Sequence, residues 1–177
     1  MVDIRKKVEE DRGLIKKIEL VIPGFRGYRK REDLRIADSL LRSQLADRVR
    51  IVRRTIESCR ENLTKKMVLE FIEDAGGLIN QITMIEEKIR HAEQGYTGIS
   101  PDYRIEEDEL NRLYEWDLSL LSYIEELKTN ATTLQQAISS DDKPSIRQKM
   151  DLLNENLQDL QEVFEKRRET IAGLVVE

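Results

Sequence analysis

The sequence predicts an all-α fold, an elongated antiparallel bundle of long amphipathic helices, for three reasons. Apolar residues recur at steps of three and four along most of the 177 residues, which places them on one face of a helix. Charged residues make up 37% of the chain and hydrophobic ones 39%, a balance typical of helices with one buried stripe. The 8 glycines and 3 prolines are few enough to leave long stretches uninterrupted.

A first helix is predicted from about residue 3 to 20, because apolar residues recur there at helical spacing. Pro23 and Gly24 end it. The stretch from 22 to 31 that follows is a turn or loop rich in glycine, aromatic and basic residues.

The next segment carries one long apolar seam, and every step along it is three or four residues. The seam runs through Leu34, Ala37, Leu41, Leu45, Val49, Val52, Ile56, Cys59, Leu63, Met67, Phe71, Ala75, Leu78, Ile82, Ile85, Ile89 and Ala92. A loop would reset this phase, so we expect one continuous helix from about 32 to 92. Gly76 and Gly77 cost about 1 kcal/mol each inside it. A break near Asn62 is the alternative.

Two further helices are predicted, from 104 to 139 and from 145 to 172, after a second glycine-rich loop at 94–103. The turn at Asp141, Asp142 and Pro144 is short, so these helices are antiparallel neighbours. With 64–92 they would form a three-helix, coiled-coil-like bundle, and the preceding part of the chain would fold as an N-terminal helical hairpin arm. A turn near Asn62 would instead give a compact four-helix bundle.

The net charge of −5 is unevenly distributed. Residues 1–66 hold 19 Lys and Arg against 11 Asp and Glu, a net charge of +8, and residues 67–177 hold 11 against 24, a net charge of −13. The sequence therefore predicts a basic helical arm, 1–63, and an acidic helical bundle, 64–177, sharing one long helix.

Catalytic and cofactor motifs do not emerge from the sequence. The lone cysteine, Cys59, falls on the apolar seam, and the lone histidine, His91, lacks the Glu-x-x-His pattern of di-iron bundles. We expect no enzyme activity, no metal, no cofactor and no small-molecule substrate. The chain also lacks a membrane-spanning stretch, and its first residues lack the apolar core of a signal peptide, so we expect a cytoplasmic protein.

The strongest candidate for a binding site is the basic corner before the long helix, because free amides and the helix dipole also favour anions there. Its residues could dock a phosphate, a lipid headgroup or an acidic peptide. They are Phe25, Arg26, Tyr28, Arg29, Lys30, Arg31, Arg35 and Arg42. Structurally, Phe25 and Tyr28 could instead staple the corner against the bundle.

An arginine flank continues from this corner along one side of the seam. It comprises Arg31, Arg35, Arg42, Arg53 and Arg60. The flank could follow an anionic membrane or a nucleic-acid backbone. It could also pair with acidic residues of its own or another helix, as spacing allows for Arg42 with Asp38 and for Arg53 with Glu57.

Several motifs resemble those of a family of prokaryotic helical proteins with no established activity. They are Pro23-Gly24-Phe25-Arg26-Gly27-Tyr28, Arg31-Glu32-Asp33-x-Arg35-x-Ala37-Asp38, Tyr96-Thr97-Gly98 and Leu113-Tyr114-Glu115-Trp116-Asp117. The resemblance spans roughly residues 22–125 and implies a helical fold without assigning functional residues. The long helices are also similar in architecture to phage-shock and spectrin-type coiled-coil proteins.

Charge and periodicity together favour a non-enzymatic scaffold or adaptor that binds a protein partner or another copy of itself through coiled-coil helices. A peripheral binder of anionic membrane surfaces, acting through the basic arm, is the alternative. An acidic protein without stacking aromatics on a basic face is a poor candidate for binding nucleic acid.

Overall fold

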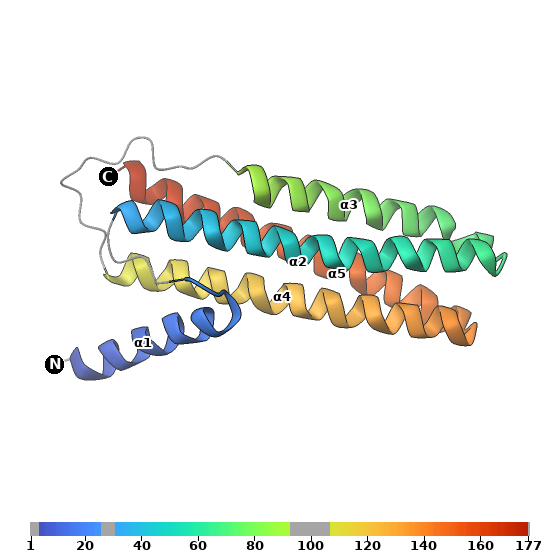
Figure 1. The fold of residues 1–177 in the computed structure, drawn as a ribbon, viewed down its shortest axis with the longest axis horizontal. Coiled ribbons are helices and arrows are strands. Elements are labelled where there is room, and N and C mark those ends of the chain that lie inside the picture. Colours follow the sequence, from blue (N-terminus) through green and yellow to red (C-terminus); the bar gives the residue numbers. More distant parts are fainter. Residues whose placement is uncertain (1–3, 26–30, 93–106, 177) are drawn as a thin grey trace. The chain divides into compact units, whose positions relative to one another are not determined.

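The computed structural model describes residues 4–25, 31–92 and 107–176, with side chains over 13–25, 36–92 and 110–172, and these residues form helices and turns without strands. The elements are α1 (Ile4–Val21), α2 (Arg31–Lys65), a short 3₁₀ helix η1 (Leu69–Phe71), α3 (Ile72–His91), α4 (Glu107–Ser140) and α5 (Lys143–Val176) (Figure 1). The all-α prediction is confirmed. The first helix and the last two begin and end within a few residues of their predicted limits.

The prediction of one continuous helix from 32 to 92 is wrong, because α2 ends at Lys65 and α3 begins at Ile72. The chain turns through Met67, whose φ is 59°, a left-handed value that ends a helix. The backbone N–H of Val68 donates to the carbonyl of Leu63 at 3.0 Å, and that of Met67 to the carbonyl of Thr64 at 3.0 Å. These bonds form a Schellman turn, so the alternative of a break near Asn62 is the arrangement found, with α2 ending at Lys65.

The turn between α4 and α5 has the same construction. Asp141 has a φ of 60°, and the N–H of Asp142 donates to the carbonyl of Ala137 at 3.1 Å. Asp142 also begins α5, since its carboxylate accepts hydrogen bonds from the backbone N–H (3.2 Å) and the hydroxyl (2.6 Å) of Ser145. One short turn therefore ends α4 and caps α5, as the predicted antiparallel pairing requires.

The chain divides into two compact units, and each draws on the basic first third and on the acidic remainder. Unit 1 comprises 1–44, 93–121 and 163–177, and unit 2 comprises 45–92 and 122–162. Helices α2, α4 and α5 contribute residues to both. The predicted division between residues 63 and 64 falls inside unit 2, in the last turn of α2.

Unit 2 is a four-helix bundle, the predicted alternative to a three-helix one. Its part of α2 pairs with α3 through the ion pair of Arg53 with Glu86, and with α4 through that of Arg48 with Glu125. α5 in turn pairs with α3 through Arg147 and Asp74. Lys66, just beyond α2, donates from Nζ to the carbonyls of Ile138 (2.7 Å) and Ser139 (2.8 Å) at the end of α4.

These contacts fix the directions of the helices in unit 2. α2 and α4 are parallel neighbours. Arg48 contacts Glu125 where each helix enters the unit, and Lys66 contacts the carbonyl of Ile138 where each helix ends. α3 and α5 are likewise parallel neighbours, and the two short turns make α2–α3 and α4–α5 antiparallel. The core between them is largely apolar, with Val49, Ile56, Leu63, Ile82, Leu134 and Leu157 at most 1% exposed.

Unit 1 assembles α1 with the first part of α2, the first part of α4 and the last part of α5. The apolar residues Ile18 and Ile22 of α1 and its following turn are fully buried, as are Leu41 on α2 and Leu113 on α4. Polar residues share this interior, and they form the first part of the site described next.

Candidate functional site

The predicted basic corner is anchored in unit 1 by Phe25, which is 3% exposed. Its ring meets that of Tyr114 edge to face, with centroids 6.4 Å apart and planes at 83°. Gly24 supplies the left-handed backbone of the turn, with a φ of 86°, and the Gln44 side chain donates to the carbonyl of Pro23 at 3.3 Å. Phe25 therefore staples the corner, as its structural interpretation predicted.

The basic residues of the corner lie largely beyond what the structure describes. Arg26, Tyr28, Arg29 and Lys30 fall outside the described residues. Arg31 and Arg35 stand in the first turns of α2, and their side chains are outside the described ones. Their role as an anion-binding or partner-binding site stays a prediction.

Arg42, the last residue predicted for this site, lies in the interior instead of on the surface. It is 6% exposed, and its Nε donates to Asp38 Oδ2 at 2.8 Å. The predicted local pair with Asp38 is thus present, and burial makes it part of a larger network.

Arg167 of α5 is the centre of that network. It is 2% exposed, its Nε donates to Asp117 Oδ1 of α4 at 2.5 Å, and its Nη1 lies 2.8 Å from Asp38 Oδ1 of α2. That second contact is an ion pair without hydrogen-bond geometry, which leaves Asp38 Oδ1 without a hydrogen bond. Two arginines and two aspartates balance in charge, as the burial of ions requires. Three helices of unit 1 are joined by this cluster.

Sequence reasoning missed Arg167 and Asp117, although their positions carried a signal. The apolar seam of α4 skips from Leu113 to Leu120, and Asp117 fills the position between them at helical spacing. The seam of α5 skips from Phe164 to Ile171, and Arg167 fills that gap. Opposite charges at gaps in two buried seams would have predicted an internal ion pair.

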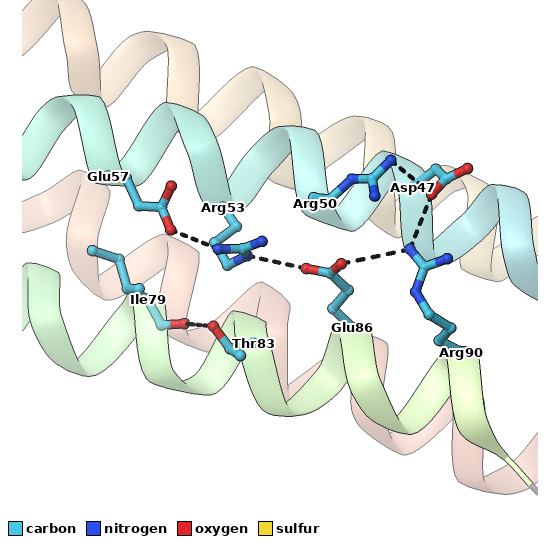
Figure 2. A network of polar contacts seen from close by, with 8 residues as sticks. All are labelled: Asp47, Arg50, Arg53, Glu57, Ile79, Thr83, Glu86 and Arg90. Atoms are coloured by element: carbon cyan, nitrogen blue, oxygen red, sulfur yellow. Dashed lines mark hydrogen bonds and ion pairs between the residues drawn. The ribbon is translucent and has the colours of Figure 1, made fainter.

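Unit 2 carries its own network, between α2 and α3 (Figure 2). Glu86 of α3 accepts from Arg53 Nε at 3.0 Å and lies 3.5 Å from Arg90 Nη2. Arg53 also donates to Glu57 at 2.7 Å, the local pair that the sequence predicted. Arg90 donates to Asp47 at 2.9 Å, and Asp47 also pairs with Arg50 at 3.0 Å.

The electrostatics of this network keep its arginines charged. The hydrogen bond that Arg53 donates to Glu86 is the largest cause that raises the pKa of Arg53. The hydrogen bond that Arg90 donates to Asp47 is the largest cause that raises the pKa of Arg90. Glu86 is nearly buried, with 7% of its side chain exposed, whereas about a quarter of each arginine is exposed. The network therefore lies at the partly exposed edge of the contact between α2 and α3.

The arginine flank is therefore engaged inside the fold over much of its described length. Arg42 and Arg53 have acidic partners in units 1 and 2 respectively. Arg60 is exposed on α2 and lies against α3, where a Cβ added to Gly76 would be 3.7 Å from its guanidinium carbon. Pairing with acidic residues, one of the predicted uses of the flank, is present at Arg42, with Asp38 on its own helix, and at Arg53, with Glu86 on α3.

The lone cysteine and the lone histidine, the residues considered for catalysis, occupy positions that the fold explains. Cys59 is fully buried, and burial raises the pKa of its thiol to about 11, so it stays protonated at neutral pH. His91 Nε2, in the last turn of α3, lies 3.1 Å from Glu87 Oε2. In the part of the chain that the structure describes, no three His, Cys, Asp or Glu residues are placed to hold a metal ion. No described helix is long and apolar enough to cross a membrane.

An open groove of about 360 Å³ lies between α3 and α5 of unit 2. Its lining combines apolar, acidic and amide residues with one arginine: Glu73, Asp74, Gly77, Leu78, Gln81, Arg147, Met150, Asp151 and Asn154. Leu78 and Met150 are buried at 5% and 3% exposure, so they form the floor. Arg147 pairs with Asp74 at 2.5 Å, and its guanidinium lies 4.8 Å from the centroid of the Phe71 ring.

The fold and these sites define an all-α helical-bundle protein with ion networks built into its helix contacts. Comparison with known proteins finds no protein-family model, no curated protein and no solved structure that matches the chain.

Proposed function

We propose that the protein is a non-enzymatic scaffold that self-associates through coiled-coil-like helix contacts, with the groove between α3 and α5 as its receptor surface. The observation that carries this proposal is the form of the groove. Its buried floor of Leu78 and Met150 is bordered by Glu73 and Asp151, which are exposed. A helix with apolar and basic residues on one face is the complement of such a groove.

The charge layout supports a protein partner over an anionic surface. Within the described residues, Arg42 and Arg53 of the arginine flank are already paired with carboxylates. Large apolar side chains, in contrast, remain in water on α1, α2 and α3 and in the α2–α3 turn. They are Leu20, Ile36, Ile51, Met67, Leu69 and Met84, each more than half exposed.

Sedimentation velocity over a range from low to high micromolar concentration tests the proposal. We expect the weight-average mass to rise above the 20.8 kDa of one chain as concentration increases. A parallel flotation assay with anionic and neutral vesicles tests the alternative of a membrane-surface protein. A monomer at every concentration that floats only with anionic vesicles would contradict self-association and favour that alternative.

A variant that fills the groove connects association to this surface. Gly77→Gln places a polar side chain over the floor and is expected to reduce association. Thr83→Gln is the matched control, because Thr83 is exposed on the same helix and is not among the residues of the groove. Equal loss in both variants would show that the substituted helix, and not the groove, is responsible.

A further inference from the structure

We propose that the groove between α3 and α5 of one copy receives the outward face of α1 from a second copy. This inference rests on the proposed function and names its partner surface. Three observations lead to it: a glycine that the fold itself does not require, the chemistry of the groove, and a complementary exposed face on α1.

Gly77 stands inside α3, where glycine costs about 1 kcal/mol relative to alanine. The conformation of the chain does not explain it, because Gly77 does not have a left-handed φ. Crowding does not explain it either, because a Cβ added there would meet nothing within 4 Å. What a missing side chain does provide is room for a second backbone to approach the floor of the groove closely.

The groove selects for a cationic helix with an apolar anchor. Leu78 and Met150 offer apolar surface below Gly77, and Glu73 and Asp151 add negative charge at the edge. The positive charge of Arg147 is matched by Asp74 at 2.5 Å. The net charge of the lining is therefore negative.

The outward face of α1 has the complementary chemistry. Lys16 and Lys17 are exposed, and Leu20 is 79% exposed. At about 100° per residue these three side chains share one face of the helix, because Leu20 follows Lys16 and Lys17 at the i+4 and i+3 positions. Leu20 is the anchor for the floor of the groove, and the two lysines are partners for Glu73 and Asp151.

α1 can present this face without leaving its own unit. Ile18 on the opposite side of α1, and Ile22 just after it, are fully buried within unit 1. The wider segment favours the same partner, since residues 1–31 contain 10 Lys and Arg against 5 Asp and Glu. Docking therefore needs no unfolding of α1 and brings a basic segment to an acidic surface.

The groove and α1 are different surfaces of the chain, so each copy offers one groove and one α1 face. The two surfaces can pair reciprocally in a closed dimer, or the contact can repeat from copy to copy as a ring or an open chain. Because different residues form the two surfaces, their charges can be reversed separately, which makes a complementation experiment possible.

The experiment uses two charge-reversed forms of the full chain. The groove form carries Glu73→Lys and Asp151→Lys, and the helix form carries Lys16→Glu and Lys17→Glu. We expect each form alone to lose association, because its own charges now repel the surface it must meet. An equimolar mixture of the two forms should associate again, because the reversed groove of one form matches the reversed α1 of the other, and the two unmodified surfaces match as well.

The control form carries Glu61→Lys and Asp159→Lys, which reverse two exposed carboxylates that are not part of the groove. It should associate like the unmodified chain. Sedimentation velocity gives the masses, and circular dichroism melting shows that every form is folded. Gly77→Gln, which leaves all charges in place, is the second variant and should also weaken association at least about tenfold.

The outcomes separate this inference from the proposed function. An unmodified chain that is monomeric throughout the concentration range overturns both. An unmodified chain that associates, with groove and helix forms that associate equally well, overturns the groove–α1 contact and leaves self-association standing. Loss in both forms without recovery in the mixture also overturns the contact, because direct pairing of the two surfaces must restore it.

Discussion

Units 1 and 2 use charge in opposite ways. In unit 1 the side chains of Asp38, Asp117 and Arg167 are at most 3% exposed, so the ions lie in the core. In unit 2 the core is largely apolar and Glu86 is the one nearly buried ion among the described residues. Its partners Arg53 and Arg90 lie at the edge of the core, where about a quarter of each side chain meets water. The same chemical groups therefore have different energetic weight in the two units.

The difference between the units shows where the loss of one ionic partner is most costly to the fold. A buried ion that loses its partner has no water to replace it, so removal of one partner is far more costly than the net stabilisation by the pair. A half-exposed ion recovers much of that energy from solvent. In unit 1 a helix arrangement that separates Asp38, Asp117 and Arg167 leaves charges unpaired in the core, whereas in unit 2 water can solvate Arg53 and Arg90.

The largest expected effect comes from the buried cluster. Asp117→Ala removes one of the two carboxylates that pair with Arg167 and leaves Arg167 and Arg42 to share Asp38 in the core. The resulting excess of buried positive charge should lower the free energy of unfolding by about 3 to 5 kcal/mol, measured by urea denaturation. Glu115→Ala, at an exposed position on the same helix, should change it by less than about 0.5 kcal/mol.

Apolar replacement of both partners sharpens this prediction. Asp117→Leu combined with Arg167→Met removes the buried charge at both ends and should be more stable than Asp117→Ala. Asp38 and Arg42 keep their own pair at 2.8 Å in that variant. A double variant no more stable than Asp117→Ala would mean that the cluster does not act through desolvation.

A smaller effect is expected in the network between α2 and α3 of unit 2. Glu86→Gln removes the charge that Arg53 and Arg90 share and should lower the free energy of unfolding by about 1 to 2 kcal/mol. The difference should shrink in high salt, because the arginines are partly exposed to solvent. A loss as large as that of Asp117→Ala would erase the contrast between the two units.

The turns of the two units differ in a similar way, and the effect is smaller again. In unit 1 the left-handed backbone after α1 is at a glycine, Gly24, whereas in unit 2 the left-handed backbone after α2 is at Met67. Met67→Gly should therefore stabilise the protein by about 0.5 to 1 kcal/mol, and Gly24→Ala should destabilise it by about 1 kcal/mol. Thermal melting of the two variants measures both, and shifts of the same sign would contradict the expectation.

The smallest effect concerns the cap of α5 in unit 2. The hydroxyl and the backbone N–H of Ser145 lower the pKa of Asp142 below its ordinary value, the hydroxyl being the larger cause. The resulting stabilisation is present above the ordinary pKa of an aspartate, and it is lost as the pH falls through the lowered one. In Ser145→Ala the pKa of Asp142 should rise, as an NMR titration of the carboxyl carbon would show. An unchanged pKa would contradict the assigned cause.

The sequence was sufficient for the fold class because helical periodicity is a local property. It was insufficient at the α2–α3 turn, where Met67 keeps the phase of the seam and yet is 74% exposed. No glycine or proline marks that turn, and Val68, one position later, is the residue at its buried edge. A Schellman turn followed by a 3₁₀ segment can restore the phase, so an unbroken seam does not imply an unbroken helix.

In the candidate sites, contacts within one helix could be predicted from the sequence, whereas contacts between helices could not. The pairs of Arg42 with Asp38 and of Arg53 with Glu57 were predictable, because four residues separate the partners on one helix. Arg167 and Asp117 are 50 residues apart, so their contact depends on the register between two helices. The groove depends on the pairing of α3 with α5, which no pattern within either helix specifies.

The placement of Trp116 and Cys59 allows the two units to be followed separately. The chain has one tryptophan and one cysteine, and Trp116 belongs to unit 1 whereas Cys59 belongs to unit 2. The indole N–H donates to Thr170 at 3.1 Å, so its fluorescence reports on the contact between α4 and α5 in unit 1. The thiol is fully buried, so a thiol reagent modifies it only when unit 2 opens. Helices α2, α4 and α5 contribute to both units. Comparing the loss of Trp116 fluorescence with the exposure of Cys59 would therefore show whether the two units unfold together or separately.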